Sequence, residues 1–222
     1  MGERQVTIGG ETLPVPQPFL VLATQNPIES EGVYRLPEAQ RDRFLMKVLV
    51  DYPAPAEEME IVRRMGVAEP EPGRVLDLEA IGIWQERARD VIVDQGVLDY
   101  AVNLVLATRS PGFHGLADLE PMIEFGASPR ASLGLVSAAR AIALLRGRDY
   151  AVPQDVFDIA PDVLRHRLVP SYEALASDID VEQLLIRILS TVPAPMISPS
   201  TQDPGRLDEA VWTPPATTSD TP

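Results

Sequence analysis

Hydrophobic and polar positions near the N-terminus follow patterns that are typical of β-strands. Alternating apolar and polar residues on both sides of a Gly-Gly pair predict a polar β-hairpin over residues 4–17. Two continuous apolar runs, at residues 19–24 and 45–50, predict short strands that are buried on both faces, as in a parallel sheet. A short helix is predicted between these two runs, around residues 37–43.

From residue 56 onwards, apolar positions recur at the spacing of amphipathic helices. This pattern predicts a bundle of roughly six helices, of which the strongest covers residues 128–145. Pro153 is expected to open a later helix, and Pro161 to break or restart it, because proline lacks the backbone N–H that a helix uses. Residues 193–222 are rich in proline, serine and threonine, so a disordered tail is expected there.

These patterns divide the chain into three parts. Two buried parallel strands cannot form a stable sheet alone, because such a sheet needs further strands and helices on both faces. Residues 1–52 are therefore expected to be the C-terminal part of a larger α/β domain, and residues 53–192 a helical domain, followed by the tail at 193–222. The predicted fold class is α/β plus all-α, with the end of a parallel-sheet core followed by a helical bundle.

The composition excludes several classes of site. Acidic residues outnumber basic ones by 33 to 19, and the net charge of −14 argues against a nucleic-acid partner and repels anionic membranes. Without cysteine the chain has no disulfide and no cysteine-bound zinc, and two histidines do not favour a metal site, so no metal ligand is predicted. Residues 1–18 contain no apolar signal-peptide core, and no apolar run approaches the roughly 20 residues of a membrane span. A soluble cytoplasmic protein is expected.

The first segment with candidate chemistry ends in Asn26. This amide follows the apolar run 19–24, at the C-terminal end of the predicted strand, where open α/β sheets bind their ligands. An asparagine there can accept a hydrogen bond from a water molecule and donate one to a phosphate oxygen. Alternatively, Asn26 only caps the loop before Pro27.

The second candidate segment, LPEAQRDRF, contains Arg43 at the end of the predicted short helix. An arginine in that place can project across a subunit boundary, where its permanently charged guanidinium binds phosphate oxygens. Such an arginine finger neutralises the charge that develops in phosphoryl transfer. The alternative is a surface ion pair of Arg43 with Asp42 or Glu38.

The third candidate segment, GASPRAS, places Arg130 in the first turn of the strongest predicted helix. Ser128 suits the N-cap and Pro129 the first helical position. A cation in the first turn opposes the helix dipole, at a cost of roughly 0.3–1 kcal/mol, unless an anion is bound at the same end. The alternative is a salt bridge between Arg130 and one of the many acidic residues.

In this order, the three segments together resemble the AAA+ ATPases, and their amino-acid sequences resemble those of the MoxR subfamily. The resemblance extends over about residues 3–192. It rests on contiguous blocks rather than isolated letters, namely QVTI (5–8), FLVLATQNPIE (19–29), EG (31–32), LPEAQ (36–40), DRF (42–44), GASPRA (126–131), GRDY (147–150), VPQDV (152–156) and VLRHRL (163–168).

The resemblance implies a role for each candidate. Asn26 would be sensor 1, which positions the attacking water, and Arg43 would be the arginine finger on the neighbouring subunit's ATP, with Arg41 as a second candidate. Arg130 would be sensor 2 of the lid domain, in contact with the phosphates, whereas His166 would pack within the lid. The family resemblance further implies a homohexamer with chaperone-like action on partner proteins, often ones with von Willebrand factor A domains.

Two expected motifs of such an ATPase are not found in the sequence. A P-loop needs G-x-x-x-x-G-K-[ST], but the only lysine is Lys47, which Val48 follows. A Walker B motif ends in acidic residues, and the only Asp-Glu pair is Asp208-Glu209 in the tail. The chain is therefore expected to be the C-terminal portion of such an ATPase, to use Mg²⁺ only together with an N-terminal part, and to hydrolyse no ATP alone. The alternative is a non-enzymatic helical interaction or regulatory module.

Overall fold

The computed structural model describes residues 5–25, 36–65 and 73–195. It begins with the predicted hairpin, in which β1 (Gln5–Ile8) pairs antiparallel with β2 (Glu11–Pro14). Gly9 and Gly10 have φ angles of +61° and +90°, which residues with a side chain rarely adopt. The Gly-Gly pair thus forms the turn that the sequence predicts.

The two apolar runs do not form the predicted strands. Residues 19–24 and 45–50 are not in strands in the structure, and Leu22 and Val50 are 85% and 90% exposed. A strand is stabilised by hydrogen bonds to a neighbouring strand and by cover on its faces. Among the described residues neither run has a neighbouring strand, and this explains the difference.

The other strands of the described part are short and lie among the helices. β3 (Ile92–Val93) pairs parallel with β5 (Tyr150–Ala151), and β4 (Ile123–Phe125) pairs antiparallel with β6 (Val169–Pro170). Each pair is a two-stranded sheet that joins segments far apart in the sequence, so these sheets connect distant parts of the helical region.

Helices make up most of the described chain beyond residue 54, as the spacing predicts. Their bounds are α1 (Glu38–Arg41), α2 (Pro55–Met65), α3 (Leu78–Asp90), α4 (Gln95–Arg109), η1 (Pro111–His114), η2 (Ala117–Met122), α5 (Pro129–Leu145), α6 (Pro153–Leu164), α7 (Tyr172–Ala176) and α8 (Val181–Thr191). The predicted break at Pro161 is wrong. Pro161 lies inside α6, and its carbonyl accepts the N–H of Arg165, so the last turn continues beyond the proline.

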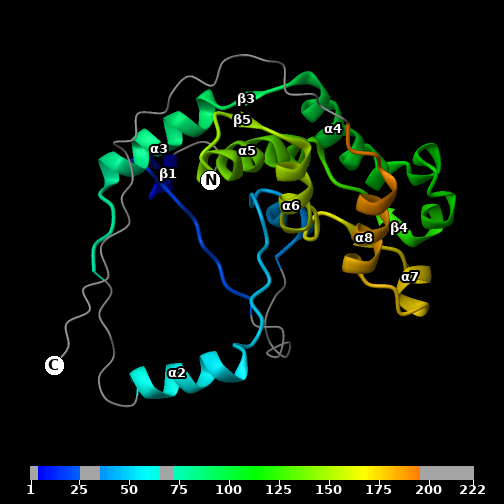
Figure 1. Ribbon diagram of the computed structural model, residues 1–222, viewed down its shortest axis with the longest axis horizontal. Helices are drawn as coiled ribbons and strands as arrows, with labels where there is room; N and C mark the ends of the chain where they lie inside the picture. The colour runs from blue at the N-terminus through cyan, green and yellow to red at the C-terminus, as the bar shows by residue number, and fades with distance from the viewer. Residues whose placement is uncertain (1–4, 26–35, 66–72, 196–222) are drawn as a thin grey trace.

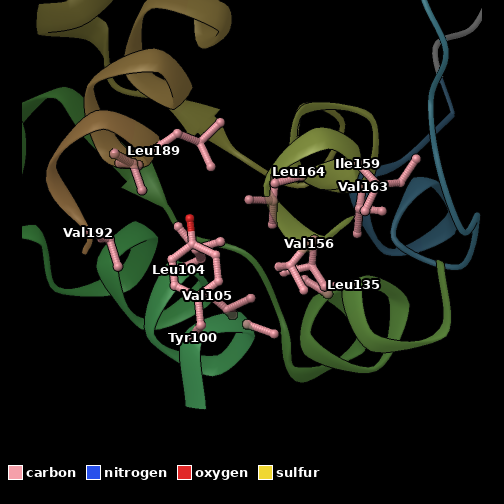
Figure 2. Packing of buried hydrophobic residues seen from close by; sticks show 14 of the residues in the cluster. Tyr100, Leu104, Val105, Leu135, Val156, Ile159, Val163, Leu164, Leu189 and Val192 are labelled. Atoms are coloured by element: carbon pink, nitrogen blue, oxygen red, sulfur yellow. The ribbon is translucent and has the colours of Figure 1, made fainter. Parts of the chain in front are cut away.

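The core of the described part lies between α4, α5, α6 and α8. Figure 2 shows Tyr100 and Leu104 of α4, Leu135 of α5, Val163 of α6 and Leu189 of α8 in this cluster. In Figure 1, α2 stands apart from the bundle, and none of its residues is buried. No helix in the described ranges is both long and apolar enough to cross a membrane.

Candidate functional site

Of the three candidate residues, Asn26 lies outside the described residues, so the structure does not place it. Arg43 and Arg130 are both described. They come from segments 87 positions apart in the sequence, and an acidic residue, Asp42, connects the two segments.

Arg43 follows the short helix α1, which begins after Pro37. Its side chain is exposed, and its backbone N–H donates to the Gln40 carbonyl, at 3.3 Å, in the turn that ends the helix. Arg41, the second finger candidate, instead lies 3.8 Å from Glu38 in an ion pair on the same helix. Neither predicted partner of Arg43 forms an ion pair with it, because Asp42 binds elsewhere and Glu38 pairs with Arg41.

Asp42 is the centre of the candidate site. Its carboxylate accepts hydrogen bonds from Ser128 Oγ at 2.8 Å, from Arg130 Nη1 at 3.0 Å and from Arg167 Nε at 3.0 Å. Burial by itself would raise the pKa of Asp42, but the hydrogen bonds from Ser128, Arg130 and Arg167 outweigh it and lower that pKa below 3.8. Asp42 is therefore an ionised carboxylate at neutral pH.

Arg130 lies in the first turn of α5 and its side chain is 56% exposed. Ser128 caps this helix, because its Oγ accepts the backbone N–H of Arg130 at 3.2 Å while it donates to Asp42. An anion does lie at this helix end, and within the described chain it is the carboxylate of Asp42. The salt-bridge alternative for Arg130 thus corresponds to what the structure shows.

A cavity of about 240 Å³ lies beside this cluster. Its walls include the polar residues Glu38, Asp42 and Ser128, together with Phe125 and His166. The wall thus carries both charges, with the Asp42 carboxylate bound to the guanidinium of Arg167.

Arg167 is a functional candidate that the sequence analysis missed, although it belongs to the quoted block VLRHRL. Its side chain is 3% exposed and donates to the Asp42 carboxylate and to the carbonyls of Asp42, Phe44 and Leu45. No local pattern indicates this role, since Arg167 and Asp42 are 125 positions apart in the sequence.

His166 is buried next to Arg167 and lies 3.1 Å from the Phe44 carbonyl through Nε2. Burial, followed by the charge of Arg167, lowers the pKa of His166 from 6.5 to about 4. An imidazole of this kind is neutral at pH 7, which agrees with its predicted place as a packing residue.

The lowered pKa of His166 predicts an acid-sensitive fold. Between pH 6.5 and 4 the unfolded chain binds a proton at His166 that the folded chain does not, so stability is present above pH 6.5 and declines as the pH falls toward 4. Urea unfolding at several pH values should show this slope, and His166→Gln should flatten it. Equal slopes in the parent chain and in His166→Gln would contradict the assignment.

The residues that are present fit phosphate better than metal. Arg43 and Arg130 carry guanidinium groups, which form charge-assisted hydrogen bonds with phosphate oxygens. Within the described ranges no three histidine, aspartate or glutamate side chains gather in a group that could hold a metal ion. The charges of Arg43 and Arg130 are thus of the kind that suits a phosphate group.

Comparison with known proteins identifies the family. The model of the ATPase family associated with various cellular activities (AAA) matches residues 1–46, and the model of the AAA lid domain matches residues 117–188. The chain is 54% identical over 198 residues to Chaperone MoxR1 of Mycobacterium tuberculosis and 35% identical over 214 residues to Protein MoxR of Methylorubrum extorquens. The chain belongs to the MoxR family of AAA+ ATPases.

This membership confirms the predicted fold class, the C-terminal portion of an AAA+ core followed by a helical lid. A solved structure of a proposed ATPase from Cytophaga hutchinsonii agrees, with a TM-score of 0.82 and 39% identity; the match covers 87% of this MoxR-family chain and 59% of that chain. The match to MoxR1 covers 89% of this chain and 52% of MoxR1, and the match to the Methylorubrum protein 88% and 60%. The chain thus spans between half and two thirds of these relatives.

Proposed function

We propose that this chain supplies the arginine finger, the sensors and the lid of a MoxR-type AAA+ ATPase, which hydrolyses ATP to remodel or activate partner proteins. In this proposal Arg43 acts on the ATP of a neighbouring subunit, Arg130 contacts phosphates as sensor 2, and Asn26 positions the attacking water as sensor 1. The name of one relative, Chaperone MoxR1, supports the chaperone-like role.

The observation that carries the proposal is the position of Asp42. Its carboxylate binds Arg130, and Arg43 is the next residue in the chain. Both guanidinium groups therefore arise from one small area of the surface, although they belong to two parts of the molecule. Two permanently charged forks in one area are suited to a polyphosphate, whose charge is spread over several oxygens.

The ion pair between Arg130 and Asp42 can be exchanged for phosphate at little cost. Asp42 also binds the buried Arg167 and Ser128, so its carboxylate keeps two partners when Arg130 turns away. Arg130 itself is half exposed, and an exposed ion pair contributes only about 0–1 kcal/mol. A phosphate can therefore compete with Asp42 for this guanidinium.

The proposed assembly is a homo-oligomer, since a finger acts only across a subunit boundary, and by family resemblance it is a hexamer in the cytoplasm. Partner proteins with von Willebrand factor A domains are proposed as its targets on the same ground. ATP supplies the phosphates that the arginines bind. The P-loop and the Mg²⁺ ligands would come from a further part of the protein, since the match with this chain covers only 52% of MoxR1.

We expect the chain alone to hydrolyse no ATP, because its sequence contains neither G-x-x-x-x-G-K-[ST] nor a Walker B motif. A phosphate-release assay on the pure chain should give no rate above background. A chimera in which the remaining segment of MoxR1 precedes this chain should hydrolyse ATP. Its rate per subunit should rise with protein concentration, because the subunits assemble. Turnover by the pure chain that Arg130→Ala abolishes would refute the first expectation.

The second candidate is a non-enzymatic interaction module. The exposed apolar side chains of α2 favour it, since Met59, Val62 and Met65 are each more than half exposed. A chimera that assembles but hydrolyses no ATP, combined with a pure chain that binds other proteins through α2, would favour this module over the ATPase part.

A further inference from the structure

The loop that carries Arg43 is fastened to the helical lid rather than to the hairpin part of the chain. Lys47 donates its backbone N–H to the Asp162 carbonyl at 2.8 Å and accepts from Arg165 Nη1 at 2.6 Å. Leu45 lies against α5, because a Cβ added at Gly134 would come within 3.4 Å of its Cδ1. Residues 42–47 thus contact the lid through both backbone and side-chain atoms.

Arg167 makes the largest number of polar contacts with this loop. Its Nε donates to the Asp42 carboxylate at 3.0 Å, and its Nη2 to the carbonyls of Asp42 at 3.2 Å and Phe44 at 2.5 Å. Its Nη1 donates to the Leu45 carbonyl at 3.1 Å and to the Val163 carbonyl on α6. All five N–H donors of the guanidinium are therefore engaged, so Arg167 has none left for a phosphate.

We infer that Arg167 is a positioning residue, which fixes the Arg43 loop to the lid so that Arg43 and Arg130 move as one body. Arg167 fixes the backbone on both sides of Arg43, through the carbonyls of Asp42 and Phe44. Its contact with the Asp42 carboxylate fixes the group that also binds Arg130 and Ser128 at the start of α5. A change in the lid angle therefore displaces both arginines together.

Only arginine has the geometry that this position needs. The five acceptors come from four residues of the loop and of α6, and the planar guanidinium presents its five donors in a rigid fork. The ammonium group of lysine is a point charge with three donors. Lysine would keep the charge opposite Asp42 but lose part of the contacts that define the loop.

A spin-label experiment on the full chain tests this inference directly. The chain contains no cysteine, so Gln40→Cys on α1 and Leu145→Cys at the end of α5, both exposed, give two unique label sites. Pulsed electron paramagnetic resonance should give one narrow distance distribution in the parent chain. Arg167→Gln should broaden it at least about twofold, whereas Arg187→Lys, at an exposed ion pair with Asp118, should leave it unchanged.

Folding is checked by circular dichroism, and Arg167→Lys replaces the glutamine variant if that variant loses its helical signal. An unchanged narrow distribution in a folded Arg167 variant would overturn the inference. Loss of the whole fold in both variants would also overturn it, because Arg167 would then hold the bundle together rather than position the loop.

The effect on catalysis rests on the function proposed above and is measured separately. In the chimera, Arg167→Lys should lower kcat by about 10- to 100-fold with little change in KM, since a displacement of about 1 Å costs up to 10²-fold. It should add little to the loss caused by Arg43→Ala. A broadened distance distribution with an unchanged kcat would leave the positioning role intact and count against Arg43 as the finger.

Discussion

Replacing Arg43 with alanine should lower the rate of ATP hydrolysis by about 10³-fold or more, the effect known for arginine fingers. The guanidinium stabilises charge that develops on the transferred phosphoryl group, and this stabilisation is absent from the ground state. The loss should therefore fall on kcat. The measurement is steady-state ATP hydrolysis by the chimera that joins the remaining segment of MoxR1 to this chain.

Arg41→Ala is the matched control for this prediction. Arg41 lies on the same short helix and is also a finger candidate, but it is paired with Glu38 in the structure. We expect its removal to change the rate less than about threefold, as for an exposed ion pair. A large loss with Arg41→Ala and a small one with Arg43→Ala would reverse the assignment of the finger.

A mixing experiment determines whether Arg43 acts across a subunit boundary. Subunits that carry Arg43→Ala should inactivate unmodified neighbours as they are added, because each active site borrows an arginine from the next subunit. A rate that falls only in proportion to the added variant would contradict action in trans and leave Arg43 a residue of its own active site.

Local signals predicted the parts of the fold that depend on local physics. Gly9 and Gly10 predicted the hairpin because only glycine adopts their positive φ angles easily. Ser128 and Pro129 predicted the start of α5 because capping depends on a few adjacent residues. These elements need no distant part of the chain to be recognised.

The prediction of strands at 19–24 and 45–50 was wrong, because an apolar run does not show whether a neighbouring strand is present. An apolar run indicates that side chains suit a buried strand, but the strand forms only where another strand donates and accepts its hydrogen bonds. The second run shows what can replace such a neighbour, since Lys47 pairs with the end of α6 instead. Such a contact between distant residues leaves no pattern in the sequence.

In the candidate site, too, local sequence patterns predicted some features, whereas contacts between distant residues were not predicted. The sequence singled out Arg43 and Arg130 and foresaw a salt bridge as an alternative for each. The sequence did not predict that Asp42 forms no ion pair with its neighbour Arg43. Asp42 instead binds Arg130 and Arg167, which lie 88 and 125 positions away. Which arginines Asp42 binds depends on how α1, α5 and the end of α6 pack together.

The largest expected effect on stability belongs to Asp155, a fully buried carboxylate at the start of α6. It accepts hydrogen bonds from Arg148 at 2.5 Å, from Arg146 at 2.8 Å and from the Val152 N–H at 2.9 Å, and so fastens the turn after α5 to α6. Burial alone would raise the pKa of Asp155, but the bonds from Arg148 and Val152 outweigh it and lower that pKa below 3.8.

Asp155→Asn should therefore cost about 3 kcal/mol of unfolding free energy at pH 7, because Arg148, whose side chain is only 22% exposed, loses its buried counter-charge. Urea unfolding followed by circular dichroism measures this. Asp158→Asn, on the same helix and also bound to Arg146, is the matched control; its carboxylate is one-third exposed, and its loss should cost less than about 1 kcal/mol.

The stabilising charge of Asp155 is present above its unfolded pKa and lost below its lowered folded pKa. The difference in unfolding free energy between wild type and Asp155→Asn should therefore narrow as the pH falls below about 4. Equal losses in the two variants would mean that burial adds nothing to the contribution of Asp155.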